Sequence, residues 1–220
     1  MVRGAEVLQE SLLGLDEKGS PQHASALLAE MERSVEAAGG WDEVGSIAVG
    51  LGPGSFTGLR IGIATARAAA LSRDLPVVGV CTLDAIGRAL AGGRAEGTTS
   101  LALLDARRDE VFWALYGHRG ERLWDPAVGT PDALAARLEG LEQPPLCAGS
   151  GAVRFRHELE RLGIEVPDDK DGVHRVSARH ICALAETRED KDAAEAVEPI
   201  YLRPPDAERW RERDTVQTTD

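Results

Sequence analysis

The first half of the chain alternates apolar runs with helical repeats. Residues 6–13 predict a short strand. Ser20-Pro21 then begins a helix, with serine as the N-cap and proline in the first turn, and Gly39-Gly40 ends it. The apolar positions of this helix follow the i, i+3, i+4, i+7 spacing of an amphipathic helix: Ala24, Leu27, Leu28, Met31, Val35 and Ala38. The chain therefore opens with a strand and a helix that has one apolar face.

Two more strands in this half are each followed by a helix. Residues 44–50 and 76–81 are short, nearly continuous apolar runs, which is typical of buried strands. A helix from about residue 59 to residue 73 joins them. Thr82 caps a third helix, which runs to about Leu90.

The second half begins after a stretch that is typical of a linker. Residues 91–99 are small, flexible and polar. Residues 100–105 and 110–116 then predict two strands of a hairpin. The remaining predicted elements are a helix at 130–138, a strand at 145–148, and helices at 152–162 and 177–187. Strands alternate with helices in both halves, so we predict a mixed, mostly parallel α/β architecture.

Composition and charge narrow the classes of function. The chain has 220 residues, of which 43% are apolar, so it is able to bury a real core. With 25 Lys and Arg against 37 Asp and Glu, its net charge is −12, which argues against binding nucleic acid by this subunit alone. Aromatic residues are only 4%, which argues against a stacking platform for bases or sugars. Residues 206–220 are rich in charge and predict a solvated tail.

The cysteines and the first ten residues indicate the cellular compartment of the protein. Cys81, Cys147 and Cys182 lie far apart and form no C-x-x-C pair, as is typical of reduced thiols in a cytoplasmic protein. No apolar run approaches the roughly 18 residues that a membrane span needs, and the first ten residues lack the apolar core of a secretory leader. We therefore expect a soluble cytoplasmic protein.

A glycine-rich loop follows the strand at 44–50. It contains Gly52, Pro53, Gly54, Ser55, Phe56, Thr57 and Gly58. Backbone N–H groups and a helix dipole at such a place are able to hold an anion, but the spacing fits neither a Walker loop nor G-x-G-x-x-G nor G-x-S-x-G. The alternative is a tight turn in which glycines take positive φ and Ser55 or Thr57 caps the helix. Spacing alone favours the turn.

The helix after this loop is small or apolar on most of its sides. Arg60 and Arg67 form its one charged line. One side must pack on the sheet of its own domain, and the opposite side, which carries glycine and alanine, allows a second helix to approach closely. Whether that second helix belongs to this chain or to another stays open. Arg60 lies near the helix N-terminus, where the dipole disfavours a cation, so we expect a carboxylate partner in this chain or another.

Other patterns do not assemble an active site. The alternating charges of residues 105–110 lie at the predicted hairpin turn and are typical of a solvated tip. No histidine pair has H-x-x-x-H or H-E-x-x-H spacing, and nothing marks a nucleophile with its base. The histidines are His23, His118, His157, His174 and His180.

Three strings taken together resemble the TsaB family, also called YeaZ. They are AVGLGPGSFTGLRIGIATARAAAL at 48–71, LDARRDEVFWALY at 104–116 and EPIYLRPPDAE at 198–208. The resemblance implies a two-domain fold of the actin/Hsp70/sugar-kinase (ASKHA) type, with a first domain at 1–97, a second at 98–205 and the tail at 206–220. It also implies a non-catalytic partner of TsaD, the metal-bearing subunit that, with the ATPase TsaE, makes threonylcarbamoyladenosine beside the anticodon of tRNA.

The resemblance implies where the partner binds. Family members pair with TsaD through two helices of the first domain in a four-helix contact, and they self-pair through a similar surface. Carried onto this sequence, the interface comprises Leu27, Leu28, Met31, Val35, Arg60, Gly62, Ala66, Arg67 and Ala69. TsaD-type relatives bind metal through H-x-x-x-H, whereas here His23 stands alone with Leu27 four residues on. We therefore expect no metal, no cofactor, and contact with tRNA only through the complex.

This sequence departs from the family pattern at its start. Family members begin with two strands that precede the segment matching Gly4–Leu13, and the first carries a phosphate loop in the wider fold. Without that hairpin the first-domain sheet is short and has an exposed edge, and we expect a misassigned start codon or a truncated form. The rival class of function is an enzyme of the same superfold, either a metallopeptidase or a sugar-kinase-like ATPase.

Overall fold

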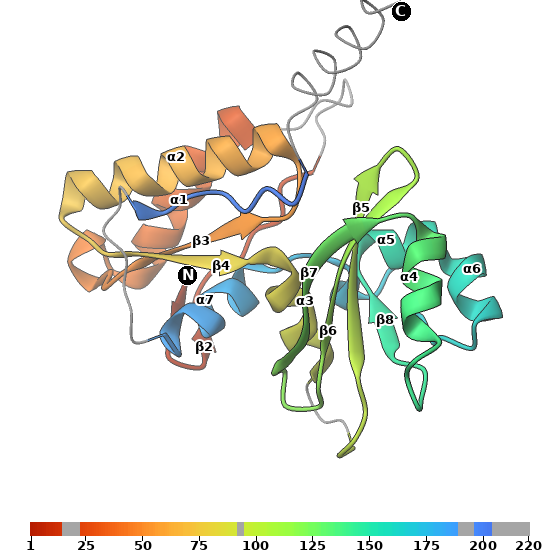
Figure 1. The fold of residues 1–220 in the computed structure, drawn as a ribbon. Coiled ribbons are helices and arrows are strands. Elements are labelled where there is room, and N and C mark those ends of the chain that lie inside the picture. Colours follow the sequence, from red (N-terminus) through yellow and green to blue (C-terminus); the bar gives the residue numbers. More distant parts are fainter. Residues whose placement is uncertain (15–22, 92–94, 189–195, 204–220) are drawn as a thin grey trace, which may run out of the picture.

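The computed structural model describes residues 1–14, 23–91, 95–188 and 196–203 of the chain. Within them the chain forms two lobes that lie side by side (Figure 1). The first lobe contains β1 (Val2–Arg3), β2 (Glu6–Val7), α1 (His23–Ala38), β3 (Ile47–Gly52), α2 (Phe56–Arg73), β4 (Val77–Cys81) and α3 (Thr82–Ala91). The second contains β5 (Ser100–Arg107), β6 (Glu110–Tyr116), β7 (Arg122–Gly129), α4 (Pro131–Leu138), β8 (Leu146–Ala148), α5 (Ser150–Arg154) and α6 (Arg156–Arg161).

A parallel pair of strands, β3 and β4, is the centre of the first lobe. On one face α2 packs Ile63, Ala66 and Ala70 against Val49 and Val77. On the other face the last helix of the chain, α7 (Ala178–Glu186), contributes Ile181 and Ala185 to a cluster with Val78 and Val80. Strands covered on both faces explain the continuous apolar runs in the sequence.

The first-lobe sheet has an open edge. Among the described residues β3 pairs with β4 alone, and β1 pairs only with β2. Beside the free edge of β3 lies a hollow of about 370 Å³, whose walls include Met31, Val35 and Val44. Among the described residues, the sheet of the first lobe therefore has an unpaired edge at β3.

The second lobe is built on a four-stranded sheet with the order β7-β6-β5-β8. The β5–β6 and β6–β7 pairs are antiparallel, and the β5–β8 pair is parallel. The expectation of a mostly parallel architecture is therefore wrong for this lobe, although the mixed α/β class is confirmed. Strand direction is set by pairing between distant segments, which the alternation of local elements does not report.

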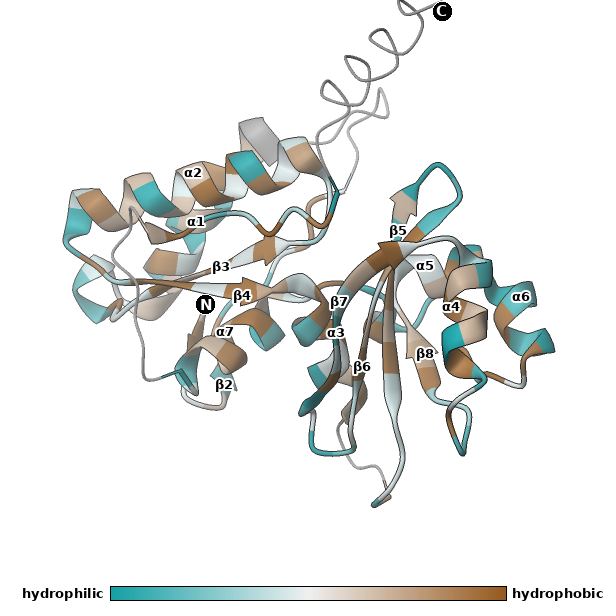
Figure 2. Ribbon diagram, in the orientation of Figure 1, coloured by the Kyte–Doolittle hydropathy of each residue, from teal (hydrophilic) through white to brown (hydrophobic). Residues whose placement is uncertain are grey.

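Each face of this sheet is covered by helices. The helix α3 packs Leu83, Ile86 and Leu90 on the face that carries Leu104 and Phe112. The helices α4, α5 and α6 cover the opposite face, which carries Leu103 and Trp113. Figure 2 shows the hydrophilic residues gathered on outer helix surfaces and on the β5–β6 turn. Since α3 follows β4 directly, it lies between the two lobes.

The final described segment returns to the first lobe. The helix α7 packs on β3 and β4, and Val197 is buried beside Val49 and Ile63. These residues lie in the stretch that the sequence assigned to a second domain at 98–205, so that stretch contributes to both lobes. The expected tail at 206–220 lies outside the described residues. No helix among the described residues is long and apolar enough to cross a membrane.

Most predicted elements are confirmed, with three exceptions. Residues 6–13 hold only the two-residue strand β2. The helix expected at 152–162 is two short helices, α5 and α6, which meet at Phe155. The third exception is the pair of strands β1 and β7, which the sequence did not predict. Ser20-Pro21, the predicted start of the first helix, lies outside the described residues.

Candidate functional site

The glycine-rich loop forms a tight turn between β3 and α2. Ser55 is the N-cap of α2, and its Oγ accepts a hydrogen bond from the backbone N–H of Gly58 at 3.3 Å. Gly52 has φ of 107°, and a Cβ built there would lie 2.9 Å from the backbone oxygen of Ile200. A side chain at position 52 would therefore be strained and would collide with the C-terminal segment. The turn interpretation is confirmed, with Ser55 and not Thr57 as the cap.

The three strings that carry the resemblance meet in space around this loop. The backbone N–H of Ile200 donates to the oxygen of Leu51 at 2.8 Å. The rings of Phe56 and Tyr201 lie 5.3 Å apart. Residues far apart in the sequence are thus brought to one end of α2, beside the boundary between the lobes (Figure 1). We call Val197–Arg203 the C-terminal strap, because it contacts both lobes.

The strap also contacts the second string, the segment at 104–116. Arg203 Nη1 lies 2.6 Å from Glu110 Oε2, and both side chains are mostly buried. From the other side of the loop, the hydroxyl of Thr82 donates to the backbone oxygen of Pro53. Tyr201 and Arg203 stand within the string at 198–208, but the sequence assigns them no role, because nothing local shows which distant residue each of them meets.

Arg60 meets aromatic rings instead of a carboxylate among the described residues. Its guanidinium carbon lies 3.9 Å from the centre of the Phe56 ring, and its Nε donates to Tyr201 Oη at 3.2 Å. A cation over an aromatic face is stabilised by the ring quadrupole. Phe56 and Tyr201 remain 39% and 41% exposed, so the resulting surface is of the aromatic and arginine type that is enriched at protein interfaces.

A cleft of about 480 Å³ lies between the loop and the second lobe. Pro53, Ser55 and Thr82 line it from the first lobe, and Asp105 and Ser150 from the second. Asp105 is the one titratable residue of its described lining. Its Oδ1 is already bonded to Arg154 Nη1 at 2.8 Å, so the described lining assembles no nucleophile with a base.

The alternating charges at the β5–β6 turn are more ordered than a solvated tip. Arg154 on α5 pairs with Asp105 and, at 2.7 Å, with Asp109 Oδ1. Arg107, Arg108 and Asp109 all have positive φ, of 63°, 54° and 57°. Three successive left-handed residues that are not glycine are costly, and the Arg154 pairs help to hold them. The tip is exposed, as expected of a solvated turn, and the Arg154 pairs add order to it.

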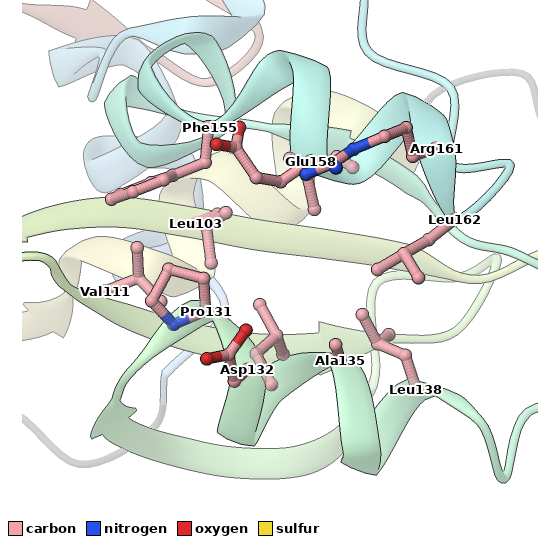
Figure 3. Close-up of a pocket in the computed structure, with 12 residues that line it drawn as sticks. Leu103, Val111, Pro131, Asp132, Ala135, Leu138, Phe155, Glu158, Arg161 and Leu162 are labelled. Carbon is pink, nitrogen blue, oxygen red and sulfur yellow. The ribbon is translucent and has the colours of Figure 1, made fainter.

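A second, apolar pocket lies on the far face of the second lobe. It measures about 290 Å³ and sits between α4 on one side and α5–α6 on the other. Figure 3 shows Leu103 and Val111 at its base, with Asp132 on one wall and Glu158 and Arg161 on the other. No motif in the sequence pointed to this pocket, because its lining comes from separate apolar positions that serve equally well as core.

The two candidate partner-binding helices lie beside each other on the first lobe. On α1, Leu28 is 56% exposed, Leu27 and Met31 are half-buried, and Val35 is buried. On α2, Arg60 is exposed and Arg67 is half-buried. A Cβ built at Gly62 meets nothing within 4 Å, so the space above it is open.

Three of the expected interface residues lie inside the chain's own core. Ala66 and Ala69 are 7% and 8% exposed, and Val35 is 5% exposed. Ala66 packs with Ile63 on the sheet. Glycine and alanine occur on both sides of α2 and differ little in size and hydropathy. The sequence therefore did not show which side of α2 is covered and which side is open. The accessible part of the predicted surface is therefore Leu27, Leu28, Met31, Arg60, Gly62 and Arg67.

Metal-ligating groups are not gathered in the described part of the chain. No set of three or more His, Cys, Asp or Glu side chains there is placed to hold a metal ion. His23 begins α1, and Leu27 follows one turn later.

Comparisons with known proteins agree with this arrangement. The family model described as TsaD, tRNA N6-adenosine threonylcarbamoyltransferase, matches residues 15–169. The tRNA threonylcarbamoyladenosine biosynthesis protein TsaB of Escherichia coli (strain K12) is 33% identical over 167 residues, which are 73% of this chain and 71% of that protein. An uncharacterized protein of Mycobacterium leprae (strain TN) is 52% identical over 89 residues, which are 40% of this chain but only 23% of that protein.

A solved structure has the same fold. It is a Pseudomonas aeruginosa protein described as similar to the peptidase YeaZ, and it superposes with a TM-score of 0.69 at 29% identity. The superposition covers 84% of this chain and 87% of the other.

Proposed function

The chain belongs to the TsaD family and, within it, to the TsaB (YeaZ) group, and from this membership we propose that it is a non-catalytic subunit in tRNA threonylcarbamoyladenosine biosynthesis. In this role it supports a TsaD-type catalytic subunit while that subunit transfers threonylcarbamoyl to the adenosine beside the anticodon. A TsaE-type ATPase is part of the larger complex. The chain contacts tRNA only through this complex, and the complex acts in the cytoplasm. The net charge of −12 supports indirect contact with tRNA.

The partner docks on the face formed by α1 and α2. The observation that carries this proposal is the open space above Gly62, which lines one hollow together with Leu27 of α1. A helix without a side chain at its centre allows a second helix to come close, and two helices from each partner then form a four-helix contact. Leu27, Met31, Arg60 and Arg67 border that face. A second copy of this chain is the alternative occupant, and light scattering with and without the partner distinguishes the two.

The absence of a catalytic role is likewise a proposal. It is supported by His23 standing one turn before Leu27 where an H-x-x-x-H pair would need a second histidine. The engaged carboxylate of Asp105 in the interlobe cleft supports it too. The rival functions are a metallopeptidase and a sugar-kinase-like ATPase. Metal content and ATP turnover of the purified chain test them, and stoichiometric metal or steady turnover would refute the scaffold role.

We further propose that the first lobe lacks the family's N-terminal hairpin, so that its sheet is one of the ASKHA type with an edge strand missing. The open edge of β3 supports this, because a two-stranded parallel sheet leaves unpaired backbone groups.

Gly62→Leu tests the docking face. The new side chain enters open space in the isolated chain, so folding is preserved, but it holds a partner helix away. We expect capture of the TsaD-type subunit to be lost in a pull-down with purified proteins. Gly62→Ala is the matched control: it adds only a methyl group, stabilises the helix by up to about 1 kcal/mol, and keeps binding. Normal capture by a folded Gly62→Leu variant would refute this face.

Ala66→Trp does not serve this test. Ala66 is 7% exposed and packs on the chain's own sheet. A tryptophan there would disturb the fold itself, so loss of binding would say nothing about the docking face.

A further inference from the structure

Positively charged side chains from three separate segments converge on one hollow of this acidic chain. Arg88 comes from α3, Arg119 from the turn between β6 and β7, and Arg179 from α7. His118 and His180 complete the polar lining of a hollow of about 510 Å³, and no carboxylate lies in its described lining. The chain as a whole carries −12, so a hollow lined by three arginines is a local reversal of charge.

The hollow lies where the two lobes meet. In Figure 1, α7 and β2 form the lower edge of the first lobe and face the lower end of β6 and β7. Its remaining walls are apolar and include Val7 on β2 and Leu184 on α7. An anion held here would therefore contact both lobes and would also have an apolar surface beside it.

The nearby carboxylates position the arginines without lining the hollow. Glu10 Oε2 lies 3.1 Å from Arg179 Nε. Glu121 accepts a hydrogen bond from the backbone N–H of Arg119 at 3.0 Å. The side chain of Arg119 instead donates from Nε to His118 Nε2 at 3.2 Å. For Arg88 the described residues supply neither a hydrogen bond nor an ion pair. Two guanidinium groups thus reach the hollow without a carboxylate of their own.

The electrostatic environment of His180 agrees with this excess of positive charge. Burial, together with the positive charges of Arg179 and Arg88, holds the pKa of His180 below its ordinary value, while Glu10 acts in the opposite direction. A neighbouring anion would be favoured by the same field.

We propose that this hollow binds a small phosphorylated organic molecule, with Arg88 and Arg119 holding its phosphate groups. Guanidinium groups match phosphate oxygens in charge and in bidentate geometry. The apolar walls favour an organic moiety over bare phosphate, and the volume is typical of small-molecule sites. The overall charge of −12 opposes a long polyanion such as RNA. This proposal is independent of the docking face on α1 and α2.

The test is titration calorimetry of the full chain with ADP, with pyrophosphate and with a short single-stranded RNA, at about 0.15 M salt. We expect ADP to bind and the double variant Arg88→Glu/Arg119→Glu to weaken it by more than about tenfold. Arg161→Glu, a single substitution of the same kind at an exposed site on α6, leaves the affinity unchanged. Both arginines of the double variant are exposed, and circular dichroism verifies folding.

Three results would overturn the proposal. The site is absent if neither ADP nor pyrophosphate binds the wild-type chain. Binding that persists unchanged in the folded double variant would place the ligand elsewhere. RNA that binds more tightly than ADP, and does so through Arg88 and Arg119, would show that the ligand is a nucleic acid and not a small molecule.

Discussion

Asp84 on α3 is the carboxylate that joins α3 to the sheet of the second lobe. Tyr116 Oη donates to its Oδ1 at 2.7 Å, and Arg122 Nη2 lies 2.6 Å from its Oδ2. The side chain of Asp84 is 15% exposed. Burial, with the neighbouring Asp84 charge, raises the pKa of Tyr116, so the phenol stays a donor at all ordinary pH values. The cluster therefore acts as one hydrogen-bonded unit.

Removing this carboxylate tests how much the unit stabilises the fold. Asp84→Ala leaves the buried Tyr116 hydroxyl without its acceptor and Arg122 without its closest partner, so we expect a loss of about 2–3 kcal/mol in urea unfolding. The control is Asp125→Ala, since Asp125 faces the same arginine at 3.6 Å but is 94% exposed. It should change nothing measurable. Equal effects of the two substitutions would contradict the assignment.

His180 gives the fold a dependence on pH. Its pKa is lowered from the ordinary 6.5 by burial and by Arg179 and Arg88, against the opposing effect of Glu10. In the unfolded chain His180 takes up a proton near pH 6.5, whereas in the folded chain it does so only at a lower pH. The stability of the fold that is present above pH 6.5 is therefore lost as the pH falls below it. We expect His180→Gln to flatten the fall in the urea midpoint between about pH 7 and 5. His157→Gln, at an exposed position, should leave the slope unchanged, and an unaltered slope in His180→Gln would contradict this origin.

At the scale of elements, the apolar periodicity predicted where the helices lie but did not predict which face of a helix is left uncovered by the rest of the chain. It placed α2, α3 and α4 to within a few residues, and Ser55 and Thr130 cap the starts of α2 and α4. On α2 it did not distinguish Gly62, which faces open space, from Ala66, which faces β3. Small side chains carry little hydropathy contrast, so only the packing decides which side of such a helix is covered.

Strand β7 shows why one element escaped prediction. Residues 122–129 contain Asp125 and Pro126 and alternate only weakly between exposed and half-buried positions. The strand lies at the edge of the sheet, where proline is tolerated because one side needs no hydrogen bonds. Its pairing with β6 is also irregular between Trp113 and Tyr116. An edge strand forms by pairing with a neighbouring strand, and the local sequence does not identify that strand.

At the scale of the whole molecule, the C-terminal strap connects the two halves of the chain that the predicted linker at 91–99 separates in the sequence. Val197 is 2% exposed in the first-lobe core, Ile200 bonds to β3, and Arg203 pairs with Glu110 of the second lobe. The three family strings were recognisable from the sequence, but their contact was not, because residues 140 positions apart share no local pattern.

Shortening one strap side chain tests whether the strap stabilises the described fold as a unit. Val197→Ala removes buried apolar surface among Val49, Ile63 and Val77, so we expect a loss of about 2 kcal/mol. Because the strap also bonds to Leu51 and to Glu110, hydrogen exchange should accelerate in β3 and at the start of β6 together. Val176→Ala makes the same chemical change at a position that is 39% exposed and should cost far less. Acceleration confined to β3 would mean that the strap serves the first lobe alone and leaves the second lobe to its own core.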